Sequence, residues 1–155
     1  MKTVLLCLLL VGCAAANNRN YTLTSGGDGG TARGRVPFDK PYELLTKEQQ
    51  GRVMSAYEHM GAGDEPPFPL GGLKTLYEPI TQERLRLRVE EGLFRGELKV
   101  DAEGNAVSMT VFETPSPGAT KLVAGVALLT KFKPALCSGN PCAMSFPFRV
   151  SFVIE

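Results

Sequence analysis

The chain has 155 residues, of which 17 are basic and 16 acidic, with one histidine and four cysteines. This balance does not favour a nucleic-acid partner, because the only basic cluster (Arg84, Arg86 and Arg88) is flanked by acidic residues and contains no aromatic ring that could stack on a base. With a single histidine, no nucleophile elbow and no glycine-rich phosphate loop, the sequence also argues against an enzyme. We therefore expect no catalytic residue, cofactor or metal site.

The N-terminus predicts export from the cytoplasm. Lys2 precedes an apolar run, Val4 to Val11, which is typical of a secretory signal and far shorter than the roughly 20 apolar residues that cross a bilayer. Leu10 to Cys13 resembles the lipobox of bacterial lipoproteins. The resemblance implies a signal over residues 1–13 and a lipid anchor on Cys13. In lipoproteins the absence of Asp directly after the anchor implies sorting to the outer membrane, so Ala14 implies a periplasmic position there. Plain secretion with cleavage after Ala16, behind a small-x-small pattern, is the alternative.

The remaining cysteines predict one disulfide. Cys7 leaves with the signal and Cys13 carries the lipid, so Cys137 and Cys142 are left in an oxidising compartment. The residues between them, 138–141, have the turn chemistry to bring two strands together. A zinc site is the alternative, but His59 is the only other soft ligand, too few for a closed tetrahedral site.

Residues 14–35, rich in Asn, Ser, Gly and Thr, predict a flexible tether, and residues 36–84 predict a helical extension. Thr46 and Gln49 form a capping-box pattern that opens a helix to about Met60. Three prolines between Asp64 and Pro69 predict an extended strap without regular structure. A second helix should run from Leu73 to about Arg86, although the alternation over residues 84–89 also fits a strand.

The C-terminal part, residues 85–155, predicts a small antiparallel sheet. Residues 94–100 and 107–111 alternate as a hairpin around a turn at 101–105, with Val107, Met109 and Val111 on its buried face. Residues 119–132 predict a helix across the hairpin, with Leu122, Val126 and Leu129 inward. The last strand alternates between an inward row and an outward row: Phe146, Phe148, Val150 and Phe152 inward, and Pro147, Arg149 and Ser151 outward. The expected fold is α+β, a small sheet packed against one helix.

The order of these features resembles the C-terminal domain of the TonB family over roughly residues 85–153. The motifs that carry the resemblance are the 101–104 turn, the run Lys131 to Ala135, Gly139 to Pro141 and the strand Pro147 to Val150. In that family the domain lies in the periplasm, and its last strand pairs with a short peptide of an outer-membrane transporter. The resemblance therefore implies an envelope protein linked to TonB-dependent transport.

The last strand is the predicted binding site. Proline suits an edge strand only where its missing N–H would face away from the sheet, so Pro147 predicts that Arg149 and Ser151 also turn their backbone groups outward. Those groups could pair with a segment of an outer-membrane transporter or another envelope protein by strand addition. Two other roles stay open: self-pairing in a homodimer of a structural envelope protein, or an edge merely protected against aggregation by Pro147 and Arg149.

Overall fold

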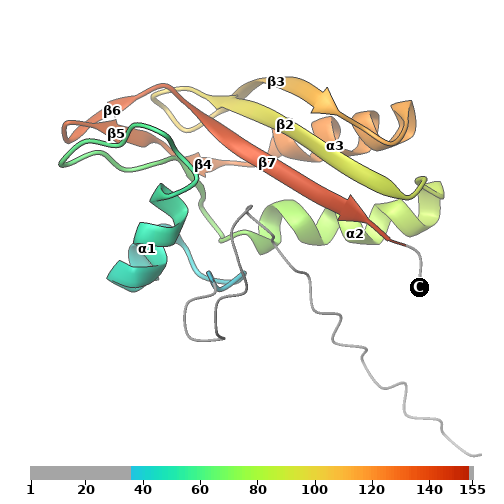
Figure 1. Cartoon of the computed structure of the whole chain (residues 1–155), viewed down its shortest axis with the longest axis horizontal. Helices are drawn as coiled ribbons and strands as arrows, with labels where there is room; N and C mark the ends of the chain where they lie inside the picture. The colour runs from blue at the N-terminus through green and yellow to red at the C-terminus, as the bar shows by residue number, and fades with distance from the viewer. Residues whose placement is uncertain (1–35, 154–155) are drawn as a thin grey trace, which may run out of the picture.

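The computed structural model describes residues 36–153, so the predicted signal, the Cys13 anchor and the 14–35 tether lie outside the described residues. This part of the chain has a mixed α+β fold (Figure 1). Its elements follow in the order η2 (Tyr42–Leu44), α1 (Lys47–Met54), β1 (Phe68–Pro69), α2 (Lys74–Leu87), β2 (Gly92–Val100), β3 (Ala106–Glu113), α3 (Pro117–Leu129), β4 (Phe132–Lys133), β5 (Ala135–Cys137), β6 (Asn140–Cys142) and β7 (Met144–Phe152).

The central sheet has three antiparallel strands in the order β3-β2-β7. The predicted hairpin is therefore confirmed as β2 and β3, and the C-terminal strand pairs with β2 rather than with β3. Strand β2 alternates strictly, with every second residue from Phe94 to Val100 buried. Phe146, Phe148 and Phe152 of β7 are buried on the same side. One face of the sheet is therefore apolar and must be covered.

Two β-bulges alter the expected pattern of β3. Val100 pairs with Ala106 while Lys99 pairs with Ser108, so Val107 is an extra residue; Phe112 is extra in the same way at the other end. Both side chains are exposed, at 51% for Val107 and 55% for Phe112. The prediction that Val107 faces the core is thus wrong, because a bulge shifts the two-residue period by one position.

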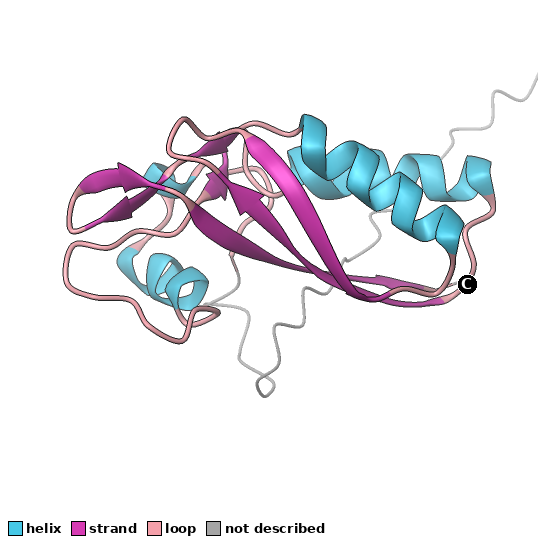
Figure 2. Ribbon diagram, turned by 90° about the horizontal axis from the view of Figure 1, so that it is seen from above, coloured by secondary structure: helices cyan, strands magenta, loops and turns pink. Residues whose placement is uncertain are grey.

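Helices α2 and α3 both lie on the apolar face of the sheet (Figure 2), so the prediction of a single covering helix is wrong. Leu76 and Ile80 of α2 and Val123 of α3 are almost completely buried in the common core. Helix α3 is capped by Ser116, whose hydroxyl accepts a hydrogen bond from the Ala119 N–H, and it ends at Leu129, before the expected 132.

Two details of the helices depart from the sequence pattern. Leu129 was expected on the buried face of α3 but is 83% exposed, because Ala127 and Thr130 take the inward positions of the last turn. Helix α2 runs through Pro79 and ends at Leu87, where Arg88 adopts a left-handed conformation and its N–H bonds to the Arg84 carbonyl. The ambiguous residues 84–89 are thus helical up to Leu87.

The N-terminal extension packs on the same core. Thr46 and Gln49 form the predicted capping box of α1, but the helix stops at Met54 instead of Met60. Two turns follow it, in which the N–H groups of Ala56 and Tyr57 donate to the carbonyls three residues earlier. The proline-rich strap is extended, as expected, yet it includes one short strand, because Phe68 and Pro69 pair with Lys133 and Phe132. Buried residues from Tyr42 to Phe152 form one core cluster across the predicted boundary at residues 84 and 85.

Candidate functional site

Strand β7 is the nine-residue strand at one edge of the central sheet, and in the part of the chain that the structure describes it pairs only with β2. Its residues alternate between two rows. The inward row includes Phe146, Phe148 and Phe152, which are buried against the helices. The outward row is exposed on the open face of the sheet, and it comprises Ser145, Pro147, Arg149 and Ser151. The residues predicted for the site are thus brought together on one edge strand.

The register shows which way the backbone groups of β7 point. In an antiparallel pair, residues directly opposite each other alternate between hydrogen-bonded and non-hydrogen-bonded positions. Pro147 lies opposite Glu97 and has no N–H to donate, which places its row at the non-hydrogen-bonded positions. The carbonyl of Arg149 supports this direction, since it accepts a hydrogen bond from the Tyr77 hydroxyl of α2. The main chain of Ser145, Pro147, Arg149 and Ser151 therefore faces away from β2.

Two side chains of α2 reach this outer edge. The Tyr77 hydroxyl donates to the Arg149 carbonyl at 3.3 Å, and Nη1 of Arg84 donates to the Val153 carbonyl at 2.8 Å. The Arg149 carbonyl, expected to be free, thus has a donor. Positions 77 and 84 are seven residues apart and lie on one face of the helix, so that face runs beside the C-terminal half of β7 (Figure 1).

Aromatic packing holds Tyr77 in place. Its ring stacks on Phe148 at 5.2 Å between centroids and meets Phe38 edge-on at 5.6 Å, and Phe148 in turn contacts Phe94 at 6.0 Å. Burial raises the pKa of the Tyr77 hydroxyl, which therefore stays a protonated donor at neutral pH. The sequence could not predict that the Tyr77 hydroxyl contacts the edge of β7, because this contact depends on how α2 packs against the sheet.

The open face of the sheet carries a row of charges across the three strands. Arg95 of β2 lies directly opposite Arg149 of β7 and also opposite Glu113 of β3, with 3.9 Å between Arg95 Nε and Glu113 Oε2. Two arginines directly opposite each other repel, and only one of them borders the carboxylate. Arg149 consequently presents a cationic side chain next to the outer edge.

The loop before β1 is fastened to the β5–β6 hairpin. Cys137 and Cys142 form the predicted disulfide, and Ser138 and Gly139 both have positive φ, as a tight two-residue turn requires. Asp64 accepts hydrogen bonds from the N–H groups of Gly61 and Ser138, each at 2.7 Å. These bonds, that of Ser138 first, hold the pKa of Asp64 below its usual value. Asp64 therefore joins the loop before β1 to the β5–β6 turn.

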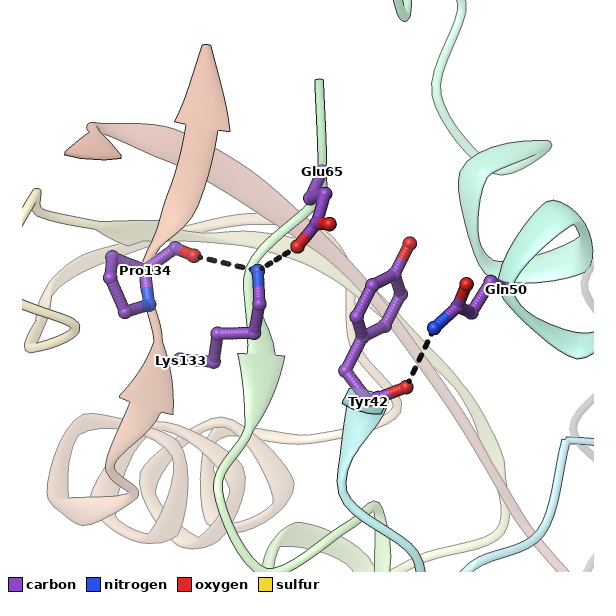
Figure 3. A network of polar contacts seen from close by, with 5 residues as sticks. All are labelled: Tyr42, Gln50, Glu65, Lys133 and Pro134. Carbon is purple, nitrogen blue, oxygen red and sulfur yellow. Dashed lines mark hydrogen bonds and ion pairs between the residues drawn. The ribbon is translucent and has the colours of Figure 1, made fainter. Parts of the chain in front are cut away.

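A second polar network joins the extension to the segment after α3 (Figure 3). Lys133 Nζ lies 2.8 Å from Glu65 Oε2 and 5.0 Å from the centre of the Tyr42 ring, and it donates to the Pro134 carbonyl at 3.2 Å. Gln50 of α1 adds a bond to the Tyr42 carbonyl at 3.1 Å. Burial, and then the charge of Glu65, raise the pKa of the Tyr42 hydroxyl. Lys133, Glu65 and Gln50 are each bonded to another residue of the chain, which indicates a structural role.

An open apolar groove of about 420 Å³ lies between the start of α2 and the end of α3. Its lining comprises Leu70, Gly71, Thr75, Pro79, Val126, Leu129, Thr130 and Lys131. Lys131 is the only ionisable residue in that lining, and its Nζ bonds to the Asn105 side chain at 2.7 Å. The groove therefore has no pair of titratable groups that could act as acid and base on a substrate.

Residues 36–153 contain no group of three His, Cys, Asp or Glu side chains placed to hold a metal ion. No helix in the same range is long and apolar enough to cross a bilayer. Cys13, the predicted lipid anchor, lies outside the described residues. Comparison with protein-family models finds no match, and comparison with curated proteins finds none with significant similarity.

Proposed function

We propose that this protein is a lipid-anchored protein of the bacterial envelope whose strand β7 binds an extended segment of another envelope protein by strand addition. The observation that carries the proposal is the outer edge of β7. A nine-residue edge strand turns one row of backbone groups away from its sheet, and Pro147 lies in that row, where its missing N–H leaves the pairing with β2 intact.

The resemblance to the TonB C-terminal domain supports the same role and suggests the partner. Two of the motifs that carry it lie together in space, because the N–H of Phe132 donates to the Gly104 carbonyl at 2.9 Å and Asn105 forms a bridge with Lys131. In the TonB family the last strand pairs with the N-terminal peptide of an outer-membrane transporter. We therefore propose such a transporter segment as the partner, in a process linked to TonB-dependent transport.

Main-chain pairing alone would bind weakly. Each hydrogen bond contributes about 1 kcal/mol net, whereas ordering each residue of the peptide costs about 1 to 2 kcal/mol. A lipid anchor on Cys13 would compensate, because two partners held at one membrane meet at a high effective concentration. The proposal thus predicts weak binding of a free peptide and stronger binding when both partners share a membrane.

Backbone NMR tests the site directly. The full chain, exported with Cys13→Ser and an intact disulfide, is titrated with synthetic peptides from the periplasmic N-termini of outer-membrane transporters of the same genome. We expect amide shifts concentrated over residues 145–152. Shifts confined to other elements, or none, would contradict strand addition, and amide protection that rises with protein concentration alone would indicate a homodimer through β7.

A matched pair of variants checks the backbone contact. Ser145→Pro removes an outward N–H from the row that already tolerates Pro147, whereas Ser145→Ala changes only the side chain. We expect the proline variant to weaken peptide binding about two- to tenfold, the effect of one net hydrogen bond, and the alanine variant to bind like the parent. Equal affinities in the two variants would mean that this N–H does not pair with the peptide.

A further inference from the structure

We infer that Tyr77 and Arg84 of α2 act as a latch that restricts strand addition to the N-terminal half of β7, beginning at Ser145 and Pro147. This inference rests on the proposed function and specifies which part of the edge the partner can use. The two latch contacts fall at Arg149, in the C-terminal half of β7, and at Val153, the residue that follows the strand.

The geometry explains why one helix can cover both carbonyls. Tyr77 and Arg84 are seven residues apart, which is about 10 Å along a helix axis. Arg149 and Val153 are four residues apart, about 13 Å along a strand, and their carbonyls point to the same side. Flexible side chains bridge the small difference, so helix and strand run close enough for both bonds.

The latch has a clear consequence for an incoming strand. In antiparallel addition, each outward residue of β7 exchanges two hydrogen bonds with the partner residue opposite it. Opposite Arg149 the partner's N–H finds a carbonyl that already accepts from Tyr77, and opposite Pro147 the partner's carbonyl finds no N–H. The partner that fits this edge is therefore a short strand whose N–H groups pair with the carbonyls of Ser145 and Pro147. The partner residue opposite Arg149 can lack an N–H, so a proline would be tolerated there.

The two latch residues are held differently. The Tyr77 ring is fixed between Phe148 and Phe38, so the hydroxyl can be removed without disturbing the packing. Arg84 donates through Nη1, but its Nε is buried without a hydrogen-bond partner among the described residues. A buried donor without an acceptor is unfavourable, so the guanidinium of Arg84 is the less stable half of the latch.

The test compares the parent protein with Tyr77→Phe and with the double variant Tyr77→Phe/Arg84→Met. Tyr57→Phe and Arg86→Met are the matched controls: the Tyr57 hydroxyl is buried without a hydrogen-bond partner among residues 36–153, and Arg86 pairs with Glu83 in the same helix. Without peptide, the carbonyl carbon shifts of Arg149 and Val153 should change in the latch variants and not in the controls. Unchanged shifts would overturn the latch, whatever the peptides do.

The same transporter peptides are then titrated into each protein, including forms N-methylated at the residue opposite Arg149. We expect Tyr77→Phe to bind about two- to tenfold more tightly than the parent, because one acceptor is released. N-methylation of the peptide should lower its affinity for the parent only slightly, because the Arg149 carbonyl is already bonded there. In Tyr77→Phe it should abolish the gain in affinity. Peptides that bind all proteins equally would refute the latch and leave strand addition standing. Peptides that shift β7 in no protein would refute both proposals.

Discussion

Gly104 offers the sharpest test of how this fold is held together. Its φ is +82°, and a Cβ built on it would overlap the carbonyl oxygen of Phe132 and lie 3.1 Å from that carbonyl carbon. The same glycine accepts a hydrogen bond from the Phe132 N–H at 2.9 Å. Gly104→Ala should therefore push β4 away from the 101–104 turn and separate two motifs of the TonB resemblance.

Gly139 supplies a matched control for this substitution. Its φ is also +82°, but a Cβ there meets nothing within 4 Å. Both alanine variants incur about 1 to 2 kcal/mol for a left-handed alanine, whereas only Gly104→Ala adds a clash with backbone, typically about 1 to 3 kcal/mol. The difference between the variants, about 1 to 3 kcal/mol, is the cost of the clash between the added Cβ and the Phe132 carbonyl.

Urea unfolding followed by circular dichroism measures this difference. With a slope of about 1 to 3 kcal/mol per molar urea for a small protein, a gap of about 2 kcal/mol separates the two midpoints by about 1 M. Both variants should keep the parent slope. Equal midpoints for Gly104→Ala and Gly139→Ala would refute the argument, because left-handed strain alone would then account for both.

Three further predictions follow from the polar contacts and the disulfide. Hydrogen bonds, that of the Asn105 N–H first, lower the pKa of Asp101 below 3.8. The ionised carboxylate therefore stabilises the fold above about pH 4, and this stabilisation is lost as the pH falls through the lowered pKa. In Asp101→Asn the unfolding midpoint should depend less on pH between pH 2 and 5 than in the parent, whereas Glu103→Gln should leave that dependence unchanged. Lys133→Met leaves Glu65 without its cation and should lower the free energy of unfolding in urea by about 1 to 2 kcal/mol, more than Lys131→Met at the exposed neighbour. Equal losses would contradict a special role for the partly buried Lys133 amine. Replacing Cys137 and Cys142 by serine should cost about 2 kcal/mol of unfolding free energy yet leave the amide shifts of β7 unchanged; shifts throughout β7 would show that the hairpin also orders the edge.

Much of the local structure was predictable because it depends on neighbours in sequence. The capping box at Thr46, the alternation of β2 and the disulfide all rest on residues a few positions apart. The misses have a common cause. The bulges at Val107 and Phe112 and the exposure of Leu129 depend on how strands and helices meet, and a periodic pattern does not carry that information.

Part of the candidate site could likewise be predicted from the sequence, and part could not. Pro147 alone predicted which row of β7 faces outward, because proline lacks an N–H wherever it stands. The reach of Tyr77 and Arg84 to the edge could not be predicted, since positions 77 and 149 are brought together only when α2 packs on the sheet.

The amino-acid sequence by itself determined the type and order of most elements, because backbone propensity, capping and proline act over a few residues. The tertiary structure alone decided that two helices cover the sheet, that the strap joins β4, and that part of the β7 edge is already bonded. These outcomes depend on contacts between residues far apart in the chain, where many packings satisfy the same local pattern and the burial of one common core selects among them.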